Sequence, residues 1–313
     1  MASIKARPYG AGHRVKAACD TSGKFLSVLF PTILASAAIY ATPACAGGQN
    51  WPFAGGNLNN TANASTENKI SVNNVSKLAV NWIFDTVGDI SATPAVVEGN
   101  VYVTDWGTGE AGGYIYKIDA ASGTLIWKHQ ISEYTGNPAS VSRNTPAVQG
   151  DIVVFGDQAP PATVIAVDKQ NGNLLWKTVI DNHFLSSVTQ SPIIFRNKVF
   201  VGTASRLEEG YSRSHPGYIR TFRGSIASLN LQTGKLIAQT FMSPSASPSV
   251  NTEQYTGTSV WGNTAVVDTK RNSLYIGTGD NYSIPTGIQY LDPNDFVDSI
   301  VALDLDTLQV KWA

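Results

Sequence analysis

The stretch TGTSVWGNTAVVDTKRNSLYIGTGDNYS, residues 256 to 283, combines side chains that could form a binding site. Trp261 lies three residues before Thr264, and the matching positions in three comparable segments are Ile90, Ser142 and Val188. An aromatic ring there can stack on a flat ligand or pack in a core. The next strand ends in GTGD, which places an acid beside it. The segment is either one more structural repeat or a repeat that also carries a site.

Four segments of the chain follow the same pattern and define the elements that would position these side chains. Each has a T/S-P strand, a polar turn, a second apolar strand, an A-x-D strand, and a last strand that ends near a tryptophan. Their bounds are residues 92 to 128, 144 to 177, 190 to 239 and 263 to 312. Four short strands recurring about every fifty residues predict the blades of a β-propeller. The fold class is therefore all-β.

The last hairpin of each unit has its own signature. Asp119, Asp168 and Asp304 precede T-G or N-G turns and can cap them through their carboxylates. We expect two-residue hairpins, because glycine supplies a positive φ. Trp127, Trp176 and Trp312 share one repeat position and are expected to pack between blades. The third unit has Ala238 at that position, and the fourth has Leu308 where the others have glycine.

The strand at residues 78 to 84, with Trp82, precedes the first full unit. It is expected to be the outer strand of a blade completed from the far end of the chain. Propellers with this repeat usually close with seven or eight blades, and about four are present here. We therefore expect the 313 residues to be an N-terminal part of an eight-bladed protein.

The first 46 residues have the pattern of a secretory signal peptide. A basic lead is followed by the apolar run FLSVLFPTILASAAIYA, and cleavage is expected after Ala46. The alternative is an uncleaved membrane anchor. Export would place the mature protein in the periplasm or outside the cell. Residues 47 to 77 are expected to be an extended segment, and residues 78 to 313 the partial propeller.

Composition narrows the function further. Both cysteines, Cys19 and Cys45, lie in the predicted signal, so the mature chain would have no disulfide and no CxxCH haem attachment. Charged residues make up 14% of the chain and the net charge is -1, which argues against a nucleic-acid-binding surface.

The repeat A-x-D-x-x-T-G-x-x-x-W resembles the pyrroloquinoline quinone (PQQ) repeat. The stretch VTQSPIIFRNKVFVGTASRLEEG, residues 188 to 210, followed by FRGSIASLN, resembles PQQ-dependent alcohol dehydrogenases. The L-E-E loop, the F-R-G-S strand and the G-T-G-x-N-Y-S turn are most similar to the polyvinyl alcohol dehydrogenase branch. So is NWPFAGGNLNNT, residues 50 to 61.

The resemblance implies a cofactor site. Trp261 would stack on the quinone, and Arg143 would approach its edge, since a guanidinium suits carboxylate or quinone oxygens. Thr189 and Ser205 match hydroxyl donors. Calcium takes oxygen ligands, and the family's two protein ligands match Glu208 or Glu209, with Glu208 favoured, and Asp280 or Asn281.

The implied activity is oxidation of a secondary or polymeric alcohol by hydride transfer to PQQ, with electrons passed to a cytochrome c. The family's catalytic aspartate follows the fourth tryptophan motif, so the base is expected beyond Ala313. Asn137 and Pro138 stand where many members have a cysteine pair. The alternatives are a non-catalytic scaffold propeller and a truncated inactive homologue. Trp261, Glu208 and GTGD together favour the enzyme over the scaffold.

Overall fold

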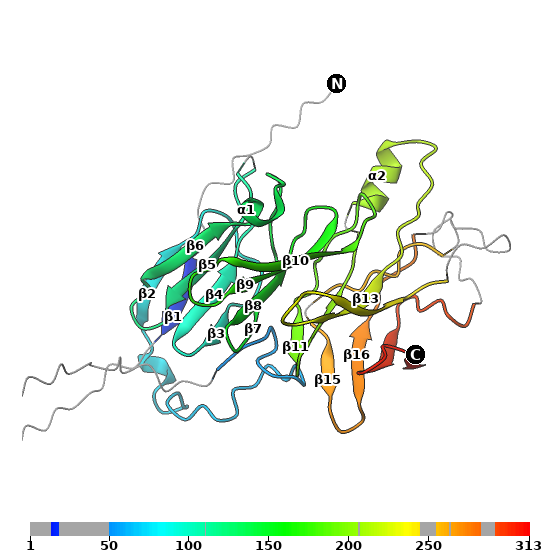
Figure 1. Cartoon of the computed structure of the whole chain (residues 1–313). Coiled ribbons are helices and arrows are strands. Elements are labelled where there is room, and N and C mark those ends of the chain that lie inside the picture. The colour runs from blue at the N-terminus through cyan, green and yellow to red at the C-terminus, as the bar shows by residue number, and fades with distance from the viewer. Residues whose placement is uncertain are drawn as a thin grey trace, which may run out of the picture.

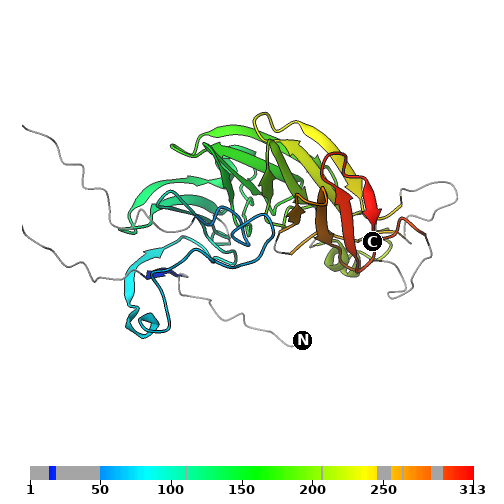
Figure 2. The same cartoon turned by 90° about the horizontal axis from the view of Figure 1, so that it is seen from below.

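The structure, a computed structural model, describes residues 14–18, 50–109, 111–205, 207–244, 255–262, 264–282 and 292–313. It contains four four-stranded antiparallel sheets, each made of strands consecutive in the sequence. The sheets follow one another in chain order along an arc (Figures 1 and 2). The predicted four-stranded blades are confirmed.

The strands of each blade run from the inner edge to the outer edge in chain order. Blade one consists of β3 (Ala95–Val97), β4 (Asn100–Thr104), β5 (Tyr114–Asp119) and β6 (Leu125–Gln130). Blade two consists of β7 (Ala147–Gln149), β8 (Ile152–Gly156), β9 (Ala162–Asp168) and β10 (Leu174–Asp181). Blade three consists of β11 (Ile193–Phe195), β12 (Lys198–Gly202), β13 (Ser225–Asn230) and β14 (Leu236–Phe241). Blade four consists of β15 (Val266–Asp268), β16 (Ser273–Gly277), β17 (Ile300–Asp304) and β18 (Val310–Trp312).

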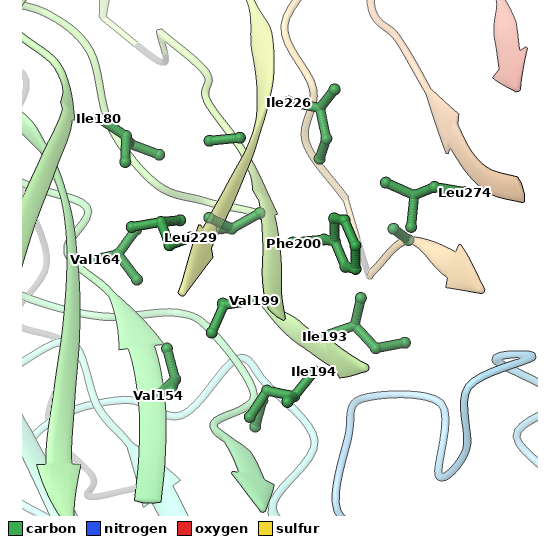
Figure 3. Close-up of a cluster of buried hydrophobic side chains, with 14 of the residues drawn as sticks. Val154, Val164, Ile180, Ile193, Ile194, Val199, Phe200, Ile226, Leu229 and Leu274 are labelled. Atoms are coloured by element: carbon green, nitrogen blue, oxygen red, sulfur yellow. The ribbon is translucent and has the colours of Figure 1, made fainter. Parts of the chain in front are cut away.

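The core lies between the faces of neighbouring blades. The second strands are apolar without alternation because both of their faces are covered, and all five residues of β8 are buried. One cluster joins blades two, three and four, and Figure 3 shows Val164, Phe200 and Leu274 among its side chains. Each blade therefore depends on its neighbours for burial of its apolar faces.

The repeated tryptophans join the blades, as predicted. Trp82, Trp127 and Trp176 are buried, and each indole Nε1 donates to a carbonyl in the last turn of the next blade: to Ala120 (2.9 Å), Lys169 (3.3 Å) and Leu231 (2.8 Å). Each ring also covers the glycine of that turn. A Cβ at Gly123, Gly172 or Gly234 would lie within 3.0 Å of the indole, and all three have positive φ. Glycine therefore serves both the turn and the contact.

The two departures from the repeat form a single contact between blades three and four. Ala238 pairs with Ser228 just as Trp176 pairs with Ala166, so it occupies the tryptophan position. Leu308 occupies the glycine position of the next turn and is fully buried at φ +56°. Two residues after Ala238, Thr240 Oγ1 donates to the Leu308 carbonyl at 2.6 Å, as Thr178 does to Gly234 at 2.7 Å. A small residue thus takes the place of the tryptophan and a large one the place of the glycine, and Ala238 packs against the cluster that contains Leu308.

Trp312 differs from the prediction. It is 53% exposed and contacts Tyr275 in its own blade, with ring centroids 5.8 Å apart. No turn of another blade covers it within the described residues.

The turns differ from the prediction in length. The carboxylate of Asp119 accepts from the N–H groups of Ala121 and Ser122, at 3.0 and 2.7 Å, so the predicted capping is confirmed. However, Asp119 N–H donates to the Thr124 carbonyl, which encloses four residues between the partners. The two-residue hairpin was wrong because the aspartate orders a turn of its own before the glycine closes the loop.

The segment before the blades spans their inner edges. Trp51 bridges Val96 of β3, the Pro52 carbonyl accepts from Val148 of β7, and the Leu58 carbonyl accepts from Val267 of β15. The short η1 helix (Val75–Lys77) follows. β2 (Val80–Asp85) places Trp82 against blade one, as expected for an outer strand, yet it pairs with β1 (Arg14–Ala18) and not with later strands. β1 falls within the predicted signal peptide, which stays a prediction.

Among the described residues, two short helices interrupt the blades, α1 (Ile131–Thr135) after β6 and α2 (Glu208–Ser214) between β12 and β13. In the part of the chain that the structure describes, no helix has both the length and the apolar character needed to cross a membrane.

Candidate functional site

Most of the predicted site residues meet in one pocket of about 250 Å³. They reach it from two kinds of segment, those that lead into inner strands and those that follow second strands. In an antiparallel sheet the start of the first strand lies beside the end of the second, so both segments meet at one end of the blades. The lining residues are Arg143, Thr189, Ala204, Ser205, Glu209, Ser259, Trp261, Asp280 and Tyr282.

Trp261 presents an aromatic face to the pocket and is 57% exposed. Its backbone is fixed by neighbours, since Val260 N–H donates to the Thr203 carbonyl at 2.9 Å and Gly279 N–H donates to the Ser259 carbonyl at 2.9 Å. A Cβ on Gly279 would lie 2.8 Å from the indole nitrogen, so only glycine allows this approach. Trp261 therefore differs from the buried tryptophans that join the blades.

Arg143 lies in another segment of the pocket wall, the one that leads into β7 of blade two. Its flanking residues Ser142 and Asn144 are fully buried, and Asn144 Nδ2 donates to the Gln190 carbonyl at 3.0 Å. The guanidinium carbon lies 5.9 Å from the centroid of the Trp106 ring, within cation–π range. The backbone is thus held firmly while the charged end of Arg143 faces the pocket.

Thr189 carries an unusual polar atom. Its hydroxyl is buried and, among the described residues, has no hydrogen-bond partner. Burying a hydroxyl without a partner costs roughly 1–3 kcal/mol. Because Thr189 lines the pocket, a ligand oxygen or nitrogen there would satisfy it.

Asp280 lines the pocket and its neighbour Asn281 does not. The segment is anchored by added strand pairing, because Thr258 N–H donates to the Asp280 carbonyl at 2.8 Å and Tyr282 N–H donates to the Thr256 carbonyl at 2.9 Å. Asn281 is buried and bridges Gly257. Of the two candidate ligands, Asp280 is the one that faces the pocket.

Glu208, the favoured ligand in the third blade, does not line the pocket, whereas Glu209 does. The Glu208 side chain is fully buried, at the base of the insertion between β12 and β13. Burial alone would raise its pKa, but hydrogen bonds from His183, Thr221, Phe222 and Tyr218 outweigh it and lower the pKa. Its oxygens are therefore committed to protein donors.

Tyr282 and Ser259 line the pocket but were not among the predicted residues. The Tyr282 hydroxyl donates to the Ser205 carbonyl at 3.0 Å and lies 2.9 Å from Ser259 Oγ. Burial raises the pKa of Tyr282 to about 12. Its place two residues after Asp280 in GTGDNYS was an available signal, since a strand directs alternate side chains to one face.

The pocket therefore offers an aromatic face, a guanidinium, an unpartnered hydroxyl and two carboxylates. The two acids, Glu209 and Asp280, are oxygen donors suited to a hard cation. Among the described residues, the pocket included, there is no group of three or more His, Cys, Asp or Glu side chains able to hold a metal ion, so protein carboxylates alone would not complete a cation's shell here.

Comparisons with known proteins agree with this arrangement. A family model described as outer membrane protein assembly factor BamB matches residues 42–209. Polyvinylalcohol dehydrogenases from Pseudomonas sp and Sphingopyxis sp. are each 25% identical to the chain, over 76% and 78% of its length. The chain covers only 36% of each of these relatives.

A solved structure leads to the same fold. The quinohemoprotein alcohol dehydrogenase from Comamonas testosteroni superimposes with a TM-score of 0.65 at 25% identity, covering 84% of this chain and 40% of that one. The family model spans more than half of the sequence. The chain therefore belongs to the PQQ-repeat family of β-propeller proteins, and its relatives include polyvinylalcohol dehydrogenases and a quinohemoprotein alcohol dehydrogenase.

Proposed function

We propose that this chain supplies the PQQ- and calcium-binding wall of an exported alcohol dehydrogenase. The observation that carries the proposal is the unpartnered Thr189 hydroxyl, buried beside Trp261 and Arg143 in one pocket. PQQ is flat and carries three carboxylates. Trp261 would cover its face, Arg143 would meet its acidic or quinone oxygens, and Thr189 and Ser205 would bind its edge.

The cation would lie between Glu209 and Asp280. Calcium takes six to eight oxygen ligands, so the two carboxylates would supply only part of its shell. Oxygens of the cofactor and of nearby hydroxyls suit the remainder. The two negative charges would also be balanced by the cation, which supports binding of the two together.

When bound, PQQ supplies a carbonyl that accepts two electrons as hydride. This chain's residues would hold and orient it, exclude water from one face through Trp261, and set its edge against Arg143. We propose an alcohol substrate, secondary or polymeric, because the similar proteins include polyvinylalcohol dehydrogenases. A cytochrome c is the proposed electron acceptor, since one relative is a cytochrome c-linked 1-butanol dehydrogenase. No described residue is assigned as the base.

Calorimetric titration of the 313-residue chain with PQQ, in calcium or in a chelator, tests the proposal. We expect binding with one site per chain, weakened by chelation. Thr189→Val should weaken it about ten- to a hundredfold, because one hydrogen bond to a charged ligand contributes roughly 1.5–3 kcal/mol. The same variant should be slightly more stable without PQQ, since it buries no unsatisfied hydroxyl. Thr189→Ser is the matched control and should bind as the parent does.

A non-catalytic propeller is the second candidate, and the description of the matching family favours it. A non-catalytic propeller of this kind would require no cofactor. Absence of PQQ binding by a folded chain would support this candidate and overturn the first.

A further inference from the structure

The insertion between β12 and β13 carries one wall of the pocket, and Glu208 stands at its base. The insertion contains α2 and returns to the blade through residues 215 to 224. Figure 1 shows α2 extending from the end of the blades. A segment that protrudes in this way needs internal contacts to hold a pocket residue in place.

The Glu208 carboxylate connects the two legs of the insertion. It accepts from the Tyr218 hydroxyl at 2.9 Å, from Thr221 N–H at 2.7 Å and from Phe222 N–H at 3.1 Å. All three donors lie on the returning leg. Charge-assisted hydrogen bonds of this kind are about twice as strong as neutral ones.

His183, which follows the last strand of blade two, also lies beside the Glu208 carboxylate. Its Nδ1 accepts from Leu185 N–H at 3.2 Å, so the neutral ring carries its hydrogen on Nε2. That nitrogen lies 3.1 Å from Thr221 Oγ1 and 3.5 Å from Glu208 Oε1. The imidazole also packs edge-to-face on Phe222, with centroids 5.7 Å apart. Glu208 is therefore surrounded by donors and aromatic rings.

Glu208 lies in the chain between two residues that line the pocket, Ser205 and Glu209. The Glu208 N–H donates to Ser205 Oγ at 3.2 Å. The outer part of the insertion is tied to blade four, since buried Arg220 donates to Ser212 Oγ at 2.9 Å and to the Tyr282 carbonyl. The buried carboxylate thus sets the backbone from which both pocket groups project.

We propose that Glu208 is a positioning residue, which fixes the insertion so that Glu209 and Ser205 face the pocket, and that Glu209 supplies the carboxylate for the cation. The second half rests on the proposed function, and the first half does not. In Glu208→Gln, an amide N–H₂ group would face N–H donors and could not accept hydrogen bonds from them, so the insertion should loosen. Glu209→Gln would remove a pocket charge and leave the insertion in place.

Limited trypsin digestion tests the first half. Arg213 lies in α2 with its side chain 73% exposed, and cleavage after it gives a fragment of defined mass. Glu208→Gln should increase the rate of this cleavage about tenfold or more, because the local opening loses several charge-assisted hydrogen bonds. Tyr218→Phe, which removes one donor, should give an intermediate rate. Glu209→Gln should be cleaved at the parent rate, since its contact with Arg213 is 3.8 Å long and exposed.

Terbium luminescence tests the second half, with Tb³⁺ alone as the probe and Trp261 as the sensitiser. Glu209→Gln should lose the signal, and Glu208→Gln should weaken affinity about tenfold at a temperature where it stays folded. If Glu208→Gln is cleaved faster but binds Tb³⁺ as tightly as the parent, Glu208 stabilises the insertion without positioning the pocket groups, and the positioning role is refuted. A parent rate of cleavage in both Glu208→Gln and Tyr218→Phe would overturn the proposal entirely. If the parent chain binds no Tb³⁺, the proposed cation site fails, and cleavage still decides whether Glu208 holds the insertion.

Discussion

The reversed contact between blades three and four predicts that two harmful substitutions will compensate for each other. Elsewhere a tryptophan covers a glycine, whereas here Ala238 faces Leu308. Replacing Ala238 by tryptophan and Leu308 by glycine together would rebuild the usual contact. The introduced indole could then donate to the Leu305 carbonyl, which matches the acceptors at Ala120, Lys169 and Leu231. Lys198 Nζ lies 3.1 Å from that carbonyl, as Lys117 Nζ lies 3.0 Å from the carbonyl of Lys169, so the two donors can share it.

The magnitudes follow from the burial of Leu308. Truncating a fully buried leucine costs about 2–5 kcal/mol. Glycine relieves the positive φ by roughly 1 kcal/mol, so Leu308→Gly should lower the free energy of unfolding by about 1–4 kcal/mol. Ala238→Trp forces a large ring onto Leu308 and should cost about 1–3 kcal/mol. The double variant should lie within about 1 kcal/mol of the parent, so the coupling should be roughly 1–7 kcal/mol in favour of the pair.

Urea denaturation of the four proteins, followed by tryptophan fluorescence and by circular dichroism, measures this cycle. The two signals must coincide, since a chain with several blades need not unfold in one step. If the two losses simply add to within about 0.5 kcal/mol, the proposed compensation is wrong. Additive losses would mean that Ala238 and Leu308 do not share one contact.

Two further predictions concern burial. Burial raises the pKa of Asp157 to about 6, although Ser140, Ala159 and Val141 donate to it. Folding therefore favours its protonated form, and this stability is present below about pH 4 and lost as the pH rises through 6. The stability of the parent relative to Asp157→Asn should fall by about 2–3 kcal/mol between pH 4 and pH 8 in urea denaturation; an equal difference at both pH values would contradict the pKa. Phe53 is 7% exposed and lies in the core, so Phe53→Ala should lower the free energy of unfolding by about 3–5 kcal/mol in thermal denaturation. Val72 is 90% exposed, so Val72→Ala should change it by less than about 0.5 kcal/mol. Similar losses from the two would show that the N-terminal segment does not stabilise the blades.

The blades were predictable because each one repeats the same local pattern. Asp119 capping its turn and Trp127 covering Gly172 both follow from residue type and spacing alone. The length of the hairpin was not predictable from glycine alone, because the aspartate adds its own turn. The compensation at Ala238 was visible only once the structure showed which turn faces which strand.

The site was predictable where a segment has a fixed register. Trp261 lies three residues before the repeat's Thr264, and Arg143 and Thr189 lie two residues before Thr145 and Ser191, so the directions of all three follow from the repeat. Glu208 and Glu209 lie in an insertion whose sequence does not follow the repeat, and sequence alone could not say which carboxylate is buried. Tyr282 was not predicted because its hydroxyl joins blade four to the Ser205 carbonyl of blade three, and sequence alone does not show that contact.

A crystal structure of the 313-residue chain grown with PQQ and calcium tests the proposed site most directly. We expect a quinone stacked on Trp261 with its edge at Arg143 and Thr189, and a cation about 2.3–2.6 Å from oxygens of Glu209 and Asp280. A cofactor bound elsewhere, or a cation held by Glu208, would contradict it.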